Sequence, residues 1–179
     1  MTTTAAPVPV SMDCYRDLMG AFPTGVAVIT AVDRVGRPHG LTCTSLTSVT
    51  LAPPTLLVSL SVGSGTGMAV QQGGGFAVNL LHARARAAAA VFGSPTPDRF
   101  SQVAWRRSPR TGQPWLSQDA FAMAECVVVN TMLVADHEVV FGQVVHVEQT
   151  VDAPLLYGLR RFCRWPVTPP AAAVAVVAR

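Results

Sequence analysis

Most of the sequence between residues 24 and 147 is a succession of extended segments, and this pattern constrains the fold more than any other feature. Residues 24–30 are rich in β-branched side chains, and residues 121–134 and 139–147 form two long strand-like runs that residues 135–138 join. Only two or three helices are expected, and none alternates regularly with the strands. The pattern predicts an antiparallel barrel rather than a parallel, doubly wound sheet.

Turns and prolines divide the remaining β-rich sequence. A turn at residues 33–38 joins the first strand to a second one around Gly40-Leu41-Thr42, which makes a hairpin. Ala52-Pro53-Pro54 separates two further runs, because proline donates no hydrogen bond to a strand ladder. Strands are therefore expected at residues 46–51, 55–62 and 76–81, with a short amphipathic segment at 68–72.

The helices and loops follow from capping residues and composition. Ser11 is placed to cap a short helix that Gly20 and Pro23 end, and its apolar positions recur at three- and four-residue steps, so that one face should lie on the core. Residues 83–92 contain four consecutive alanines and favour a second helix. Residues 95–118 are irregular and polar, which predicts an exposed loop. Residues 1–10 and 166–179 are expected to be flexible tails on one domain at 11–165.

Composition excludes several classes of protein. Half of the 179 residues are hydrophobic and 13% are charged, which excludes disorder over most of the length. The 13 cationic residues are all arginine, and a net charge of +3 is too weak to indicate nucleic-acid binding. No apolar run approaches the roughly 20 residues that span a bilayer, and no secretory signal is recognisable, so a cytoplasmic protein is expected. The four cysteines form no C-x-x-C pair and are expected to be free and mostly buried.

Several catalytic motifs fail on inspection. The run Gly63-Ser64-Gly65-Thr66-Gly67 follows a strand, but Met68 occupies the sixth position of G-x-G-x-x-G and no acidic residue follows about twenty residues later. There is no lysine for a phosphate-binding Walker motif, and neither H-E-x-x-H nor G-x-S-x-G occurs. The four histidines are widely spread and only three glutamates exist. Hydrolytic chemistry, metal chemistry and a metal site therefore have no support.

A distinctive segment remains between Asp33 and Asp98, where 64 consecutive residues contain no acid. Small hydroxyl residues gather around turns in it, and hydroxyls with free backbone amides hold phosphate where lysine is absent. The arginines of this segment add positive charge; they are Arg34, Arg37, Arg84 and Arg86. The segment therefore suits an anionic small ligand, and the alternative is a neutral segment whose hydroxyls face solvent.

A family resemblance bears on this choice. YRDLMGAFPTGVAVIT at residues 15–30 closely resembles the opening of the flavin reductases that serve two-component monooxygenases. The same order of blocks continues with GLTCTSLTSVTLAPP at residues 40–54 and FAVNLL at 76–81. Asp136-His137 with Gly142, and then PLLY at residues 154–157, complete a match over about residues 13–164.

The resemblance implies a Greek-key split β-barrel that binds FMN or FAD, usually as a homodimer. It implies hydride transfer from NADH or NADPH to the flavin and delivery of reduced flavin to a separate monooxygenase. It places His137 as the catalytic residue where the nicotinamide enters, and Asn79 beside the isoalloxazine. It places a hydroxyl-rich group near the flavin phosphate, namely Thr42, Cys43, Thr44, Ser45, Ser64 and Thr66. Residues 82–86 depart from the family pattern.

The chemistry is consistent with the absence of paired acids, because hydride transfer between nicotinamide and flavin needs orientation more than an acid or base from the protein. Two alternatives stay open at this point. One is an oxidase of the pyridoxamine-phosphate type on the same fold. The other is a non-catalytic flavin-binding module.

Overall fold

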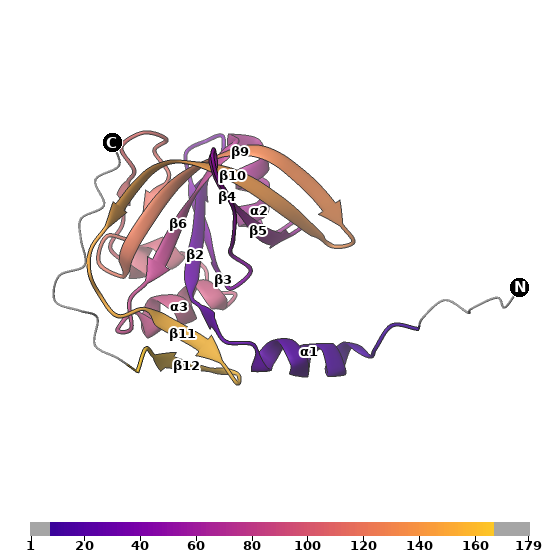
Figure 1. Ribbon diagram of the computed structural model, residues 1–179. Coiled ribbons are helices and arrows are strands. Elements are labelled where there is room, and N and C mark those ends of the chain that lie inside the picture. The colour runs from indigo at the N-terminus through magenta and orange to yellow at the C-terminus, as the bar shows by residue number, and fades with distance from the viewer. Residues whose placement is uncertain (1–7, 167–179) are drawn as a thin grey trace, which may run out of the picture.

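The computed structural model describes residues 8–166 as a curled antiparallel sheet with three α-helices (Figure 1). The helices are α1 (Met12–Ala21), α2 (Gly65–Gly73), α3 (Arg86–Gly93) and the 3-10 helix η1 (Arg99–Gln102). The strands are β1 (Thr24–Gly25), β2 (Ala27–Val32), β3 (Pro38–Cys43), β4 (Thr47–Leu51), β5 (Pro54–Ser61), β6 (Gly75–Leu81), β7 (Arg106–Arg107), β8 (Pro114–Trp115), β9 (Ala120–Val134), β10 (His137–Gln149), β11 (Leu155–Gly158) and β12 (Arg161–Arg164). Of the expected tails, residues 1–7 and 167–179 lie outside the described part.

Seven strands form the main sheet in the order β3-β2-β6-β9-β10-β5-β4, and every neighbouring pair is antiparallel. A second sheet pairs β1 with β11 and β11 with β12. The longest pair, β9 with β10, arches over the body of the molecule (Figure 1). The mainly β, antiparallel split-barrel prediction is confirmed, and so are the hairpin at residues 33–38 and the two long runs near the C-terminus.

Both faces of the central strands are buried, because helices cover them on either side. Ile29 of β2 and Phe76 of β6 belong to one apolar cluster with Val70 of α2. Val28, the next residue along β2, belongs to a second cluster with Phe92 of α3. Successive side chains of a strand point to opposite faces, so α2 and α3 must pack on opposite sides of the sheet. Truncating a fully buried phenylalanine in such a core typically costs about 3–5 kcal/mol.

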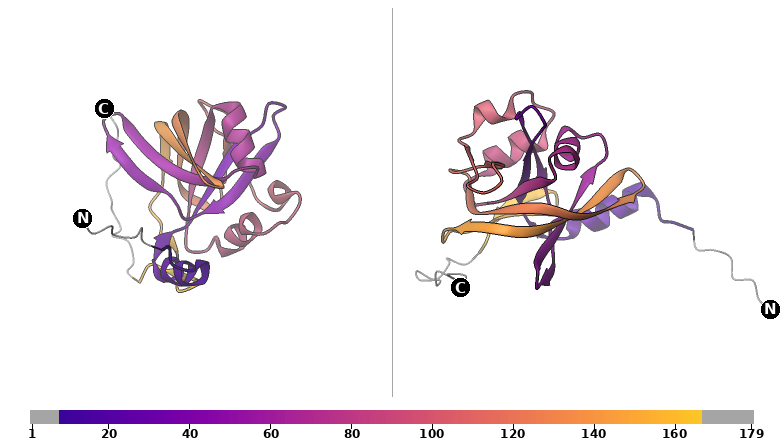
Figure 2. Two further views of the ribbon diagram at one scale, coloured as in Figure 1. Left: turned by 90° about the vertical axis from the view of Figure 1, so that its right-hand side faces the viewer. Right: turned by 90° about the horizontal axis from the view of Figure 1, so that it is seen from above.

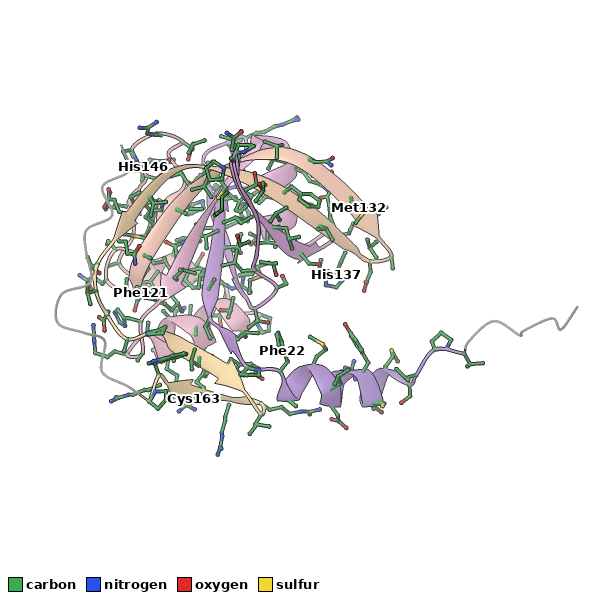
Figure 3. The ribbon with its side chains drawn as sticks, in the orientation of Figure 1. Phe22, Phe121, Met132, His137, His146 and Cys163 are labelled. Atoms are coloured by element: carbon green, nitrogen blue, oxygen red, sulfur yellow. The ribbon has the colours of Figure 1, made fainter. Side chains whose placement is uncertain are left out.

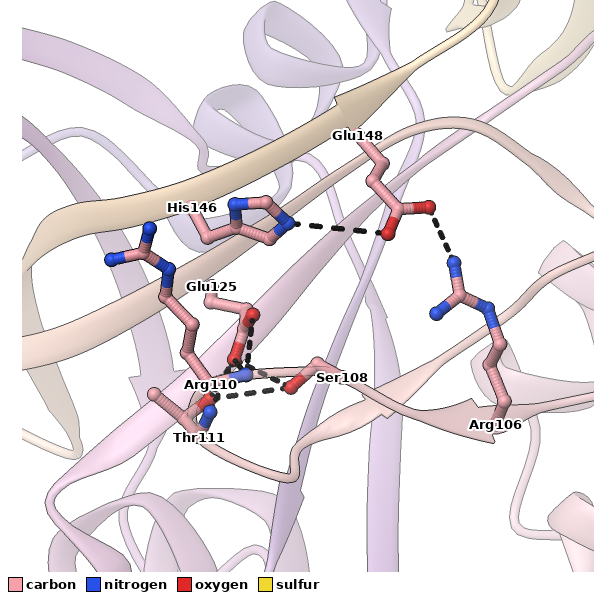
Figure 4. A network of polar contacts seen from close by, with 7 residues as sticks. All are labelled: Arg106, Ser108, Arg110, Thr111, Glu125, His146 and Glu148. Carbon is pink, nitrogen blue, oxygen red and sulfur yellow. Dashed lines mark hydrogen bonds and ion pairs between the residues drawn. The ribbon is translucent and has the colours of Figure 1, made fainter.

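The expectation of an exposed loop at residues 95–118 holds only in part: many of its residues are exposed, but a buried carboxylate ties the segment to the sheet, and residues 108 and 113–116 are buried. Glu125 of β9 is 0% exposed and accepts hydrogen bonds from Ser108 Oγ at 2.6 Å and from the backbone N–H and hydroxyl of Thr111 (Figure 4). The backbone N–H of Arg110 donates to the same carboxylate. Trp115 and Leu116 are thereby held in the interior, both 0% exposed.

Helix α1 begins as expected but does not lie on the core. Ser11 Oγ accepts a hydrogen bond from Cys14 N at 3.3 Å, which confirms the cap. None of the residues of α1 is buried, however, and the helix extends away from the sheet on the same side as the tip of the β9–β10 hairpin (Figures 1 and 2). The expected packing of one face on the core of the same chain is therefore wrong.

Two further observations concern the part of the chain from residue 8 to residue 166. It contains no helix that is both long and apolar enough to cross a membrane. Its four cysteines are free; Cys43 and Cys126 are buried, whereas Cys14 and Cys163 are exposed, so burial holds for only half of them. Burial raises the pKa of the Cys126 thiol to about 12, which keeps it neutral and unreactive.

Candidate functional site

A cavity of about 1270 Å³ opens between the two ends of the curled sheet. One wall is β3, which pairs only with β2 and so forms an edge of the sheet, and the other is the end of β5 with the first turn of α2. The segment from the end of α3 through η1 forms a third wall, and His137 reaches the rim from β10. The lining includes residues 37–45, 59–61, 64–66, 92–96, 98–101 and 137.

The unpaired edge of β3 explains why nine consecutive residues, 37–45, line the cavity. Arg99 donates a hydrogen bond to Gly40 O at 2.7 Å, so this carbonyl points away from β2. In an antiparallel strand every second residue faces the same edge, and Thr42 therefore directs its backbone groups the same way. Gly40 is required here, since a Cβ would stand 2.7 Å from the Phe92 ring. The close approach of α3 sets the width of the cavity.

The first turn of α2 supplies hydrogen-bond donors but no positively charged side chain. Ser64 is the N-cap, and its Oγ accepts from Gly67 N at 3.1 Å. Thr66 is only 3% exposed, lines the cavity, and has no hydroxyl hydrogen bond to any residue in the described range 8–166. Helix N-termini present free N–H groups and the positive end of the helix dipole, so this corner can bind an anion.

Other expected hydroxyls are already engaged within the protein. Thr42 Oγ1 donates to Ala89 O at 2.7 Å, which ties β3 to α3. Ser45 Oγ accepts from Ser59 N at 3.0 Å and donates to Ser59 O at 3.1 Å, which ties the β3–β4 connection to β5. These two side chains shape the wall, and Thr44, Ser64 and Thr66 keep donors free for a ligand.

Cys43 also lines the cavity, but as a neutral group. Its Sγ lies 3.0 Å from Ser45 Oγ. Burial raises the pKa of the Cys43 thiol, with hydrogen bonds to Ser45 opposing this in part. The thiol is therefore suited to packing rather than to nucleophilic chemistry.

His137 stands at the start of β10, opposite Ser61 in the strand register (Figure 3). Its Nδ1 lies 2.9 Å from Asp136 Oδ1, and its side chain is 48% exposed. The hydrogen bond from His137 lowers the pKa of Asp136, which therefore stays ionised and holds the ring. Nε2 of His137 is left to interact with a ligand at the cavity rim.

Asn79 does not line the cavity, which differs from its expected place beside a flavin ring. It is 0% exposed; its Nδ2 donates to Val28 O and Thr30 Oγ1, each at 3.1 Å, and its Oδ1 accepts from Leu116 N at 2.8 Å. The carboxamide thus joins β6 to β2 and to the segment after β8. Both ends of the carboxamide are therefore engaged within the fold.

The arginines of the acid-free segment divide between the cavity and the rest of the surface. Arg84 pairs with Asp152 at 2.5 Å and Arg86 lies 5.9 Å from the centroid of the Phe162 ring, and neither lines the cavity. Arg37 does line it, as does His39, a residue that the sequence did not single out. His39 follows a turn and carries no motif, so only its place on β3 reveals it.

Comparisons with known proteins agree with this geometry. A family model described as a flavin reductase-like domain matches residues 19–166. A flavin reductase (NADPH) from Lentzea aerocolonigenes is 60% identical over 151 residues, covering 84% of this chain and 88% of that protein. A flavin reductase (NADH) from Kitasatospora aureofaciens is 41% identical over 164 residues, covering 90% and 86%.

Among solved structures, an NADH:FAD oxidoreductase from Streptomyces globisporus C-1027, in complex with NAD and FAD fragments, superimposes with a TM-score of 0.79. It is 30% identical in sequence, and the match covers 89% of this chain and 93% of that one. The family match spans the cavity and nearly all of the strands that frame it.

Proposed function

The chain belongs to the family of flavin reductase-like domains, and we propose that it is an NAD(P)H-dependent flavin reductase. It transfers hydride from NADH or NADPH to FAD or FMN and supplies the reduced flavin to a separate monooxygenase. Relatives include the reductase subunit of a flavin-dependent monooxygenase from Rhodococcus jostii. Because NADH and NADPH are made inside the cell, a cytoplasmic location fits this activity.

The single observation that supports this function is the cavity along the free edge of β3. At about 1270 Å³ it exceeds the 300–1,000 Å³ typical of a site for one small ligand. It therefore has room for a flavin together with part of a nicotinamide nucleotide. Of the eight residues that the sequence assigned to the site, seven line this cavity, and Asn79 lies outside it.

The residues present fit a flavin phosphate. Thr66 is a largely buried residue that lines the cavity, and it stands in the first turn of α2 beside Ser64. A phosphate there would accept hydrogen bonds from Thr66, from Ser64 and from backbone N–H groups. Thr44, on the exposed β3–β4 connection, is a further donor. The backbone edge at Gly40 and Thr42, which lines the cavity, would be available to the ring system of the ligand.

A bound flavin supplies the hydride acceptor, which is N5 of its isoalloxazine. The protein's part is to orient the donor, to hold the phosphate and to exclude water. His137 is suited to the first task, because Asp136 fixes its Nδ1 and leaves Nε2 to bond the nicotinamide amide. A reaction of this kind needs no proton from the protein at the transferring carbon, in keeping with a wall that lacks paired carboxylates.

A homodimer completes the proposal. Helix α1 exposes an apolar face formed by Met12, Tyr15, Leu18, Met19 and Phe22. The nearby end of the β9–β10 hairpin exposes Met132, Leu133 and Val134 beside His137 (Figure 3). Large apolar side chains exposed together on an element are typical of an interface. A second copy seated on these two elements would cover it and enclose the rim of the cavity.

The decisive experiment is steady-state oxidation of NADH and of NADPH with riboflavin, FMN and FAD in turn. We expect oxidation that depends on flavin, and rapid bleaching of the flavin when it is mixed with donor in a stopped-flow instrument. Riboflavin should bind about ten- to a thousandfold more weakly than FMN, because it lacks the phosphate. Tight flavin binding without bleaching would indicate a non-catalytic module and overturn the proposal.

A further inference from the structure

One end of the cavity carries charge that the proposed flavin phosphate site does not use. Arg37 and His39 line this end, and both side chains meet Asp33 at the turn between β2 and β3. Arg37 Nε lies 2.9 Å from Asp33 Oδ2, and His39 Nε2 lies 3.1 Å from the same oxygen. The guanidinium and the imidazole are therefore held side by side.

Asp33 orients the side chains of Arg37 and His39, and both of its carboxylate oxygens already accept hydrogen bonds. Its Oδ1 accepts from the backbone N–H of Val35 at 3.0 Å and of Arg37 at 2.9 Å, in addition to the two side-chain bonds on Oδ2. Burial raises the pKa of Asp33, but these hydrogen bonds outweigh it and hold the pKa well below its ordinary value. Both oxygens of Asp33 are already hydrogen-bonded. The terminal nitrogens of Arg37 and Nδ1 of His39 do not contact Asp33 and remain available to a ligand.

Arg37 and His39 each keep nitrogen atoms that do not contact Asp33. The Arg37 side chain is 75% exposed, and its two terminal nitrogens have no hydrogen-bond partner within residues 8–166. His39 reaches the first turn of α2, since a Cβ on Gly65 would stand 3.0 Å from His39 Nδ1. His39 thus links the phosphate corner at Ser64 and Thr66 to the guanidinium of Arg37.

The opposite wall contributes one cation and one acid to the lining of the cavity, Arg99 and Asp98. Arg99 donates its terminal nitrogens to Gly40 O and to Ser94 O, which fixes it in the wall. Asp98 lies on the same segment and is exposed. Arg37 is a cavity-lining cation whose two terminal nitrogens remain free among the described residues.

From this arrangement we propose that Arg37 and His39 form a second phosphate subsite, which takes the phosphate on the adenosine side of FAD and makes FAD the preferred flavin. FMN ends at one phosphate, whereas FAD carries a second one joined to the first through a single oxygen. Two phosphates so joined require two adjacent anion sites, and His39 lies between Gly65 in the first turn of α2 and Asp33, the ion-pair partner of Arg37. A guanidinium with free terminal nitrogens matches phosphate oxygens in a forked geometry. The inference rests on the proposed flavin reductase function.

The test is an equilibrium titration of riboflavin, FMN and FAD with three proteins: the wild type, Arg37→Gln and Arg34→Gln. Arg34 is the matched control, because it lies on the same turn, is exposed, and does not line the cavity. We expect the wild type to bind FAD more tightly than FMN. Arg37→Gln should weaken FAD binding about tenfold, a modest loss because water screens an exposed guanidinium. Binding of FMN and riboflavin should change less than about twofold, and Arg34→Gln should leave all three affinities unchanged.

Three results would overturn the inference. Equal or tighter binding of FMN by the wild type would remove the preference itself. An equal loss for FMN and FAD in Arg37→Gln would assign Arg37 to the first phosphate. Loss of kcat/KM for NADPH but not for NADH in the same variant, without a change for FAD, would assign the subsite to the 2′-phosphate of the donor. Flavin affinities and donor oxidation are measured separately, so absence of reductase activity in the wild type would count against the proposed function alone.

Discussion

At the scale of single residues, His137 carries the most direct test of the donor site. His137 lines the cavity, and its Nδ1 is held by Asp136, which leaves Nε2 for a ligand. His137→Ala should lower kcat/KM for NADH or NADPH about ten- to a hundredfold, the cost of one or two hydrogen bonds. The Kd of flavin should change less than about threefold. Stopped-flow and steady-state kinetics with a saturating flavin measure both quantities.

His146→Gln is the matched control for this variant. His146 also lies on β10, but it stacks on Trp115 at 5.7 Å and does not line the cavity. The His146→Gln variant should leave kcat/KM for NADH and NADPH unchanged. If His137→Ala behaved in the same way, His137 would be a solvent-exposed histidine of the hairpin without a role in the reaction.

Glu125 carries a second prediction at this scale, which concerns stability and pH. Burial raises the pKa of Glu125, but hydrogen bonds from Ser108 and Thr111 and from the backbone of residues 110 and 111 outweigh it and lower the pKa. The unfolded state then binds the proton more tightly than the folded state does. The contribution of Glu125 is therefore complete above the ordinary glutamate pKa of about 4.3 and is lost as the pH falls through the lower, folded value.

Glu125→Gln should accordingly destabilise the fold by about 2–4 kcal/mol at pH 7, because an amide nitrogen replaces an oxygen that accepts from Ser108 and Thr111. The difference from wild type should shrink as the pH is lowered below 4. Urea unfolding at several pH values measures this difference. Glu148→Gln is the control: Glu148 is partly exposed and pairs with Arg106, and its loss should cost less than about 1 kcal/mol. A constant difference between Glu125→Gln and wild type at all pH values would contradict the argument.

Residue identity predicted which side chains reach the cavity better than it predicted what they do there. Thr42 and Ser45 were expected to bind phosphate, but their partners, Ala89 and Ser59, lie 47 and 14 residues further along the chain. A hydroxyl that bonds the backbone of another element cannot be distinguished in the sequence from one that awaits a ligand. Asn79 illustrates the same limit, since it is buried by the packing of β6, β2 and residue 116.

At the scale of elements, local signals located the strands and helices, and long-range contacts decided how they pack. The β-branched run at residues 24–30 with the turn at 33–38 was sufficient for the hairpin, and the capping Ser11 for the start of α1. The polar composition of residues 95–118 suggested exposure, yet Glu125 draws this segment onto the sheet from 14 to 17 residues away. The apolar stripe of α1 indicated a buried face without indicating what buries it.

Gly142 gives the prediction at the scale of elements. Because it has no side chain, β10 can pack closely against the Phe76 ring of β6 and against Cys126 of β9. It lies in β10 at a register shift against β9, where a Cβ would stand 2.5 Å from the Phe76 ring and 2.9 Å from Cys126 Cβ. Both neighbours are 0% exposed, so neither can move away freely. Gly142→Ala should lower the free energy of unfolding by about 1–3 kcal/mol in urea denaturation. Gly25→Ala, with nothing within 4 Å of its Cβ, is the control and should cost much less; equal costs would mean that the sheet relaxes around Gly142.

At the scale of the whole molecule, the sequence resemblance led to a homodimer, and the structure adds a reason for one. A chain that leaves an entire amphipathic helix off its own core exposes apolar surface that water does not favour. Tyr15, Leu18 and Phe22 lie three or four residues apart and so share one face of α1. All of them are more than half exposed. Pairing with a second chain, as proposed, would remove this surface from water.

Tyr15→Asp tests the dimer, since it places a charge in the middle of that face. We expect light scattering to give the mass of two chains for the wild type and a shift towards one chain for the variant at micromolar concentration. Because α1 contributes no buried residue to its own chain, the circular dichroism spectrum should be nearly unchanged. Asp13→Asn, on the opposite face of the helix, should remain dimeric. A wild type that runs as a single chain with full reductase activity would show that the exposed face of α1 serves some other contact, and that the cavity of one chain suffices for hydride transfer.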